Sequence, residues 1–248
     1  TNNRDLSRSI LIASGNKLFL STDLEQYSSD TWEEVLAMDS SWLNRTLAWD
    51  ICDNILLRGE YGTKNEQDPP RRVYLSQDHG QTWTTMYDPA INDMVDPGDH
   101  HIHAVAFDPW CNNRIWVSVA DGVNGNVIYS DDWGQTWNKL HQTVVHQPTN
   151  IICTPRAVLF ASDERPSGFR VWKRDLMEMR SMVGTSDLEF LWTPDRLASP
   201  TLNGYAFRQG AHYMDMLDSY PYTLVVPWIG GSAYPTPVRL MTSPDGLH

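Results

Sequence analysis

The residue types most able to do chemistry gather in one short segment of the chain. Residues 87–103 hold a run of acids and imidazoles: Asp88, Asp93, Asp96, Asp99, His100, His101 and His103. A strand is expected to begin near His101, and Asp99, His101 and His103 would then share one face, because side chains alternate along a strand. Two histidines at this spacing can form half of a divalent metal site when a carboxylate or a third histidine joins them, and Asp99, Glu60 and Asp121 are the candidates. Contact with a polar ligand, acid–base catalysis and purely structural packing are the alternatives for the two histidines.

A second group, Arg58, Glu60 and Tyr61, stands just before a polar loop at 62–72. A glutamate next to a tyrosine can act as an acid–base pair or hydrogen-bond a sugar hydroxyl, and an ion pair at the rim is the structural alternative. Tyr61, Trp228 and Tyr234 are candidates for aromatic platforms under sugar rings. The predicted catalytic residues are therefore Glu60, Tyr61, His101 and His103, and the predicted ligand contacts are Arg58, Asp99, Asp121 and Tyr234.

A repeat indicates the elements that must position these residues. Residues 76–83 and 130–137 both read S-x-D-x-G-x-T-W, with apolar strand patterns on each side. The match extends upstream, since 48–54 parallels 106–113. The repeating unit is therefore a whole four-stranded antiparallel sheet of about 50 residues, which predicts an all-β chain folded as a β-propeller. A lone sheet cannot bury both of its faces, whereas blades packed side by side can.

Five such units are visible in the sequence, the first and the last incomplete, and no long amphipathic helix lies among them. The expected blades of this single domain, 1–248, are 1–40, 41–90, 99–142, 148–183 and 200–248. The last unit stops at His248, where a closing strand is expected, so we expect the domain to continue beyond that residue. The five visible units are compatible with a complete ring of six or seven blades.

The S-x-D-x-G-x-T-W motif resembles the Asp-box, also called the bacterial neuraminidase repeat, of sialidase-like β-propellers. The resemblance implies that each copy is the hairpin turn between the third and fourth strands of a blade. The aspartate would accept hydrogen bonds within its own turn, the glycine would supply a positive φ, and the tryptophan would wedge between blades. These structural residues are Ser76, Asp78, Gly80, Thr82, Trp83, Ser130, Asp132, Gly134, Thr136 and Trp137. Such a motif specifies a fold rather than a function.

Connectivity places the loops at the two ends of the blades. In a sheet with strands in the order 1-2-3-4, the 1–2 and 3–4 turns share one end, so 50–54 and 108–113 should lie beside the motif turns. The 2–3 loops and the links between blades lie at the other end, and they include 62–72, 87–100 and 121–126. We therefore expect a functional site at the channel mouth opposite the Asp-boxes.

The arginines test the sialidase resemblance. Sialidases clamp a substrate carboxylate with three arginines and use a tyrosine nucleophile paired with a glutamate. The R-I-P-like segment that carries the first arginine does not occur in this sequence, and Arg58, Arg156, Arg208 and Arg239 are scattered. We therefore expect a glycan-binding or interaction module rather than a sialidase. A glycoside hydrolase or polysaccharide lyase is the alternative, so whether the chain is an enzyme stays open.

The composition of the chain limits the classes of binding partner and the location that we expect for the protein. The net charge of −12, from 19 Lys and Arg against 31 Asp and Glu, argues against nucleic acid and anionic membranes. No run of about 18 apolar residues is present, so no membrane insertion is expected. Cys52, Cys111 and Cys153 fit neither a disulfide framework nor a zinc ribbon, which leaves a Cys52–Cys111 bridge or free thiols. We expect a carbohydrate or glycoconjugate partner, other chains of a larger secreted, surface or viral-tail assembly, an extracellular or virion location, and no cofactor beyond the divalent metal.

Overall fold

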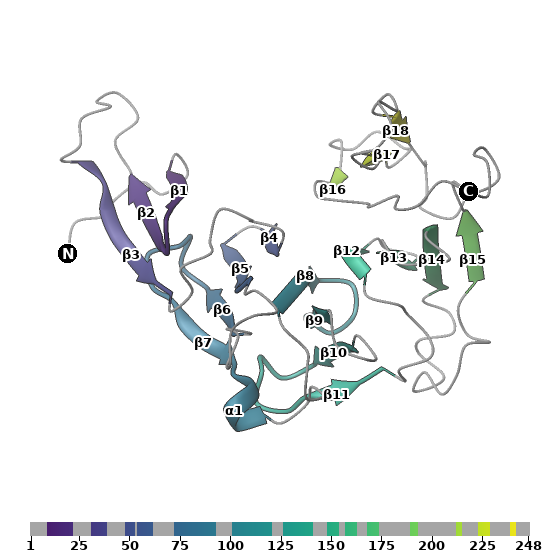
Figure 1. Ribbon diagram of the computed structural model, residues 1–248, viewed down its shortest axis with the longest axis horizontal. Helices are drawn as coiled ribbons and strands as arrows, with labels where there is room; N and C mark the ends of the chain where they lie inside the picture. The colour runs from purple at the N-terminus through teal and green to yellow at the C-terminus, as the bar shows by residue number, and fades with distance from the viewer. Residues whose placement is uncertain are drawn as a thin grey trace.

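The chain folds into five antiparallel sheets that follow one another around an arc (Figure 1). This computed structural model describes residues 9–21, 31–38, 48–52, 54–61, 72–92, 101–120, 126–140, 148–153, 157–162, 168–173, 189–192, 212–214, 223–228 and 239–241, with side chains as far as Phe160. In the described strands, the arc stays open between the first sheet and the last (Figure 1).

Each sheet is built from strands that are consecutive in the chain. The first contains β1 (Ile10–Ser14), β2 (Lys17–Ser21) and β3 (Glu33–Ala37). The second contains β4 (Trp49–Cys52), β5 (Ile55–Gly59), β6 (Val73–Ser76) and β7 (Thr84–Tyr87). The third contains β8 (His101–Asp108), β9 (Arg114–Ala120), β10 (Asn126–Ser130) and β11 (Asn138–Lys139). The fourth contains β12 (Pro148–Cys153), β13 (Ala157–Ser162), β14 (Gly168–Lys173) and β15 (Glu189–Trp192), and the fifth contains β16 (His212–Met214), β17 (Thr223–Trp228) and β18 (Arg239–Met241).

The predicted all-β class, with four-stranded antiparallel sheets in the middle of the chain, is confirmed. The fourth sheet extends beyond the approximate blade end expected at 183, because β15 pairs with β14 and carries that sheet to Trp192. The connection at 174–188 lacks the S-x-D-x-G-x-T-W motif, so no signal marked where this strand begins. One short helix, α1 (Pro89–Asn92), follows β7, and no helix among the described residues is long and apolar enough to cross a membrane.

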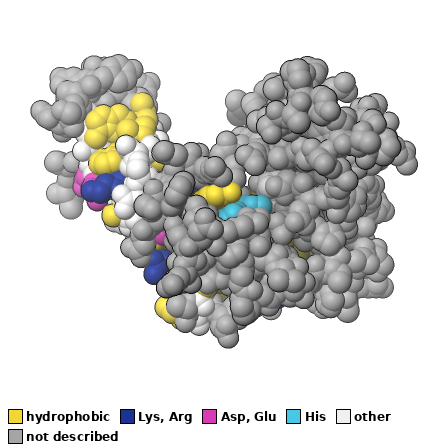
Figure 2. Space-filling view, in the orientation of Figure 1, with side chains coloured by type: hydrophobic (Ala, Val, Ile, Leu, Met, Phe, Trp, Pro, Cys, Tyr) yellow, Lys and Arg dark blue, Asp and Glu magenta, His cyan; other side chains and the backbone are white. Residues whose placement is uncertain are grey.

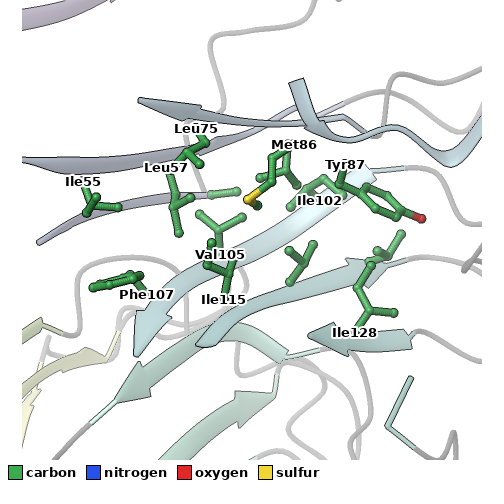
Figure 3. Packing of buried hydrophobic residues seen from close by; sticks show 14 residues of the cluster. Ile55, Leu57, Leu75, Met86, Tyr87, Ile102, Val105, Phe107, Ile115 and Ile128 are labelled. Carbon is green, nitrogen blue, oxygen red and sulfur yellow. The ribbon is translucent and has the colours of Figure 1, made fainter. Parts of the chain in front are cut away.

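The first strands of the three middle sheets lie next to one another, since β8 contacts both β4 and β12. Side chains of β8 are buried along its whole length. Val105 and Phe107 pack into a core shared with the second sheet (Figure 3), while Ala104 and Ala106 pack into another core with the fourth sheet. A strand that is buried on both faces reads as a continuous apolar run, which is the pattern of 104–107.

The turn at 76–83 is held by a network centred on Ser76 and Asp78. The Ser76 hydroxyl donates to Asp78 Oδ1 at 2.8 Å and accepts from the Gly80 amide at 2.9 Å. Asp78 in turn accepts from the Thr82 amide at 2.9 Å and from the Thr82 hydroxyl at 2.6 Å. The expected side-chain acceptor within the turn is therefore confirmed, and it fixes the hairpin that joins β6 to β7.

The turn at 130–137 repeats this network bond for bond. The Ser130 hydroxyl donates to Asp132 at 2.8 Å and accepts from the Gly134 amide at 2.8 Å. Asp132 accepts from the Thr136 amide at 2.8 Å and from the Thr136 hydroxyl at 2.6 Å. Four residue types at fixed spacing, Ser, Asp, Gly and Thr, therefore specify the same turn twice, and this second copy joins β10 to β11.

The motif glycines and tryptophans also take their expected roles. Gly80 and Gly134 have φ of 86° and 83°, the left-handed region that favours glycine. Trp137 lies edge-on to Tyr87 of the preceding sheet, with ring centroids 5.1 Å apart, and Trp83 packs against the core between the first two sheets. The tryptophans therefore wedge between neighbouring sheets. The residues before the glycines, His79 and Trp133, also have positive φ, which the motif did not predict.

In the second and third sheets, the turn between the first two strands lies at the same end as the motif turn, as connectivity predicted. Asn54 follows β4, and its side-chain amide donates to Gln77 O at 2.6 Å in the motif turn of the same sheet. In the next sheet, Arg114 makes a bidentate ion pair with Asp131, with Nε–Oδ1 at 2.6 Å and Nη2–Oδ2 at 2.9 Å. The motif turns thus mark one end of the blades, and the links between sheets mark the other.

These turns should weaken in acid. Partial burial opposes the ionised form of Asp78, but hydrogen bonds from Thr82 and Ser76 outweigh it and lower the pKa of this carboxyl; bonds from Thr136 lower the pKa of Asp132. A lowered folded-state pKa means that the unfolded chain binds the proton first. The stabilisation is therefore present above the unfolded value, about 3.9, and is lost as pH falls through the folded value.

The corresponding experiment compares urea unfolding from pH 5 to pH 2 in the wild type and the double variant Asp78→Asn/Asp132→Asn. The wild type should lose unfolding free energy more steeply with falling pH than the variant does. Equal slopes in the wild type and the double variant would contradict this assignment.

Candidate functional site

The end of β5 is clamped onto the beginning of β8. The Ile102 amide donates to Glu60 O at 2.8 Å, and the Glu60 amide donates to Arg72 O at 3.0 Å. Gly59 permits this approach, because a Cβ atom there would lie 2.4 Å from Cγ2 of Ile102. The clamp places Tyr61, two residues beyond the glycine, beside the first residue of β8.

Tyr61, His101 and His103 form a stack of three rings. The centroids of Tyr61 and His101 are 3.8 Å apart, with 27° between the ring planes. His101 and His103 follow at 4.7 Å, and Tyr61 and His103 are 6.4 Å apart with nearly parallel rings at 15°. The histidines are 2% and 4% exposed, whereas Tyr61 is half-buried. His101 and His103 therefore lie side by side, whereas Asp99, which was predicted to share their face of the strand, lies outside the described residues. Tyr61 is the member of the stack nearest to solvent.

A bulge in β8 helps to build this stack. The pairing of β8 with β9 shifts register between Ile102 and Ala104, which leaves His103 as the extra residue. Ile102 packs into the core shared with the second sheet, whereas Ala104, two residues later, packs into the core shared with the fourth sheet. In a regular strand both side chains would point to the same face, so the bulge reverses the alternation. In the space-filling view, histidine side chains (cyan) lie beside hydrophobic ones (yellow) near the middle of the face drawn (Figure 2).

Glu60 is fixed by hydrogen bonds rather than presented to solvent. Its side chain is fully buried, with Oε1 accepting from the Tyr74 hydroxyl at 2.8 Å and Oε2 from the Arg72 amide at 3.1 Å. Burial, followed by the charge of Glu60, raises the pKa of Tyr74 well above its usual range. These contacts tie β5 to β6, so the carboxylate is occupied in holding the sheet together. They favour a structural role for Glu60 over acid–base work with Tyr61.

Arg58 is also enclosed within the protein. Its guanidinium lies over the ring of Trp49 at 4.7 Å from the centroid, and Nη1 donates to Ala48 O at 3.4 Å. Among the described residues, its Nε and Nη2 atoms meet no hydrogen-bond acceptor. Burial lowers the pKa of Arg58 to about 10, while the charge of Glu60 acts in the opposite direction. A fully buried guanidinium cannot contact a ligand at the surface, so the predicted contact at Arg58 is not supported by this geometry.

The remaining site predictions fall largely outside the described residues. These are Asp93, Asp96, Asp99, His100, Asp121 and Tyr234, while Trp228 lies in β17. Asp88 is described, and it pairs with Arg72 at 2.9 Å between Oδ2 and Nε. Where the chain is described, no three His, Cys, Asp or Glu residues come together as a metal site. A divalent metal at His101, His103 and Asp99 stays a prediction.

A pocket that the sequence did not reveal lies where β4, β8 and β12 end. It has a volume of about 130 Å³, and its walls include Asp50, Ile51, Phe107, Trp110 and Ile152. Cys52 and Cys153 also line it, and both are free thiols, as is Cys111. The prediction of free thiols is therefore confirmed over that of a Cys52–Cys111 bridge. The pocket was missed because its walls come from three separate segments at the end of the blades that carries the motif turns.

Comparison with known proteins defines the fold. No protein-family model and no curated protein sequence matches the chain. Among solved structures, the GH74 xyloglucanase from Xanthomonas campestris is similar, with a TM-score of 0.60 and 13% identity over 97% of this chain and 36% of that one. A nidogen/laminin complex is matched with a TM-score of 0.48 and 13% identity over 88% of this chain and 70% of that one. YCF48 from Cyanidioschyzon merolae is matched with a TM-score of 0.46 and 12% identity over 94% of this chain and 65% of that one. This chain thus spans about a third of the xyloglucanase chain, and it has the fold of a β-propeller.

Proposed function

We propose that this β-propeller is a carbohydrate-binding module whose site includes Tyr61, His101 and His103, at the end of the blades opposite the motif turns. The observation that carries the proposal is the half-buried ring of Tyr61, held in a stack by two buried imidazoles. A rigid aromatic ring offers an apolar surface to the C–H face of a sugar. The imidazoles of His101 and His103, which are 2% and 4% exposed, fix the position of that ring. The proposal also assigns the chain to the sialidase-like β-propellers that carry Asp-boxes.

The position of Glu60 supports binding over hydrolysis. Glycoside hydrolysis uses two carboxyl groups about 5 to 9.5 Å apart on either side of the scissile bond. The carboxylate of Glu60 is buried and accepts hydrogen bonds from Tyr74 and Arg72. A hydrolase would therefore need carboxylates other than Glu60, such as Asp99 or Asp121, which lie outside the described residues. We place the module in a larger secreted, surface or viral assembly, with carbohydrate as its ligand class.

A glycan array tests the proposal with three proteins. The wild type should bind at least one glycan class saturably. Tyr61→Ala should weaken that binding about tenfold by removing the stacking surface, and Tyr61→Phe should retain most of it. Tyr61→Phe should keep the wild-type thermal midpoint, because it keeps the ring that packs on His101.

The same proteins separate the alternatives. Release of reducing sugar from a polysaccharide panel by the wild type, at a rate proportional to protein concentration, would replace the binding module with an enzyme. A wild type that retains no glycan would contradict the proposal. Equal binding by wild type and Tyr61→Ala would place the site elsewhere on the propeller.

A further inference from the structure

A second candidate site lies at the end of the blades that carries the motif turns. There the pocket of about 130 Å³ opens to solvent and is lined by the last residues of β4 and β12 and by β8 with the turn that follows it. This volume is close to that of a cavity that holds one benzene molecule, about 150 Å³, and well below the 300–1,000 Å³ of sites for cofactors or drug-sized ligands. The pocket therefore has room for a single amino-acid side chain.

The walls combine one carboxylate with apolar surface. Asp50 is half-buried in the wall, and its orientation is fixed because Oδ1 accepts from the Ile51 amide at 2.9 Å and Oδ2 from the Phe107 amide at 2.5 Å. A carboxylate has about four acceptor sites, so a cation can share these oxygens with the groups that orient them. The rest of the wall is supplied mainly by aliphatic and aromatic residues such as Phe107 and Ile152.

Two large apolar side chains reach solvent at the same place. Ile51 is 64% exposed and Trp110 is 41% exposed, and both line the pocket. The backbone of Trp110 is held by Asp108, whose Oδ1 accepts from the Trp110 amide at 3.2 Å. An exposed tryptophan beside a pocket is typical of the few residues that contribute most to protein–protein binding.

We propose that this pocket, the Asp50–Trp110 pocket, receives an arginine or lysine side chain from a polypeptide partner. The aliphatic stem of such a side chain packs on apolar walls, its charged head pairs with a carboxylate, and an indole attracts the cation. The charge of the whole chain, −12, favours a basic partner and speeds its approach. Although Cys52 and Cys153 also line the pocket, no metal-binding group of three is formed among the described residues, so a side chain is the better occupant than a metal.

The proposal is independent of carbohydrate binding, because Tyr61 lies at the opposite end of the blades. The two sites would let one propeller hold a glycan at one end and a protein chain at the other. Tyr61→Ala therefore provides a control that should leave the Asp50–Trp110 pocket unaffected.

Matched peptides test the proposal on the full chain. We would titrate acetyl-Gly-Arg-Gly-amide, with the isosteric but neutral acetyl-Gly-citrulline-Gly-amide as control, and follow amide and indole signals by NMR. The arginine peptide should shift the signals of Asp50, Phe107 and Trp110 saturably and bind at least about fivefold more tightly than the citrulline peptide. Its affinity should fall as salt is added.

Two variants locate the binding. Asp50→Asn should weaken the arginine peptide about fivefold, because it removes the charge and keeps the volume. Trp110→Ala should weaken binding of the arginine peptide by a similar factor. This second variant locates the binding even if Asp50→Asn does not fold. Equal binding of the arginine and citrulline peptides, tighter binding of a norleucine peptide, or no saturable shift in the wild type would each overturn the proposal.

Discussion

Gly134→Ala should lower the free energy of unfolding by about 3 kcal/mol, whereas Gly80→Ala should lower it by about 1 kcal/mol. Both glycines occupy the same position of the repeated turn and have nearly the same positive φ, 83° and 86°. A methyl group on Gly134 would lie 2.5 Å from Cγ of Met86 and 2.8 Å from its carbonyl oxygen. A methyl group on Gly80 would find nothing closer than 3.5 Å.

The difference between the two variants therefore isolates the steric cost of packing one sheet against the next. Met86 lies in β7 of the second sheet, while Gly134 lies in the turn of the third. Urea unfolding monitored by tryptophan fluorescence would measure both variants, with Gly15→Ala as a further control, since no atom lies within 4 Å of that position. Equal losses at Gly134 and Gly80 would show that the second and third sheets do not meet as described.

Trp116→Ala should cost about 4 kcal/mol, which is the loss expected when a fully buried aromatic side chain is truncated. Trp116 is 0% exposed and lies in the core between the third and fourth sheets, edge-on to Phe160 with ring centroids 5.7 Å apart. Its indole N–H also donates to Asp108 at 3.3 Å. The variant removes packing from both sheets and leaves a buried carboxylate with one donor fewer.

The control for Trp116 is Trp110→Ala, whose side chain is 41% exposed and whose truncation should cost about 1 kcal/mol. Trp116→Phe should fall between the two, because it keeps most of the volume but loses the N–H donor. Guanidinium unfolding of the three variants would measure the series. A loss at Trp116 no larger than that at Trp110 would contradict the packing of the fourth sheet against the third.

The repeated turn could be predicted from sequence because its hydrogen bonds are local. The bonds that Ser76 and Asp78 make to Gly80 and Thr82 all lie within the turn itself, so the spacing of these residues predicts that network. The positive φ of His79 and Trp133 was not predicted, because the motif leaves that position open to any residue. The fourth strand of the fourth sheet, β15, was missed for the related reason that no such turn precedes it.

The candidate site could be predicted only in part. Connectivity correctly brought Tyr61 to His101 and His103, because both segments lie at the same end of neighbouring sheets. The burial of the Glu60 carboxylate and its hydrogen bonds could not be predicted, because they depend on the register of β5 with β6, which brings Tyr74 and Arg72 within reach. The Asp50–Trp110 pocket depends on three strands far apart in sequence, and no local pattern reports their meeting.

The central claim is that a carbohydrate binds at the Tyr61, His101 and His103 stack, and histidine imidazole signals test it most directly. The protein would be labelled on its histidine rings and titrated with a glycan selected on the array. The signals of His101 and His103 should move saturably, while that of His79, in the motif turn at the opposite end of its sheet, should stay in place. Movement of His79 alone, or saturable binding that leaves both His101 and His103 unchanged, would contradict the proposed site.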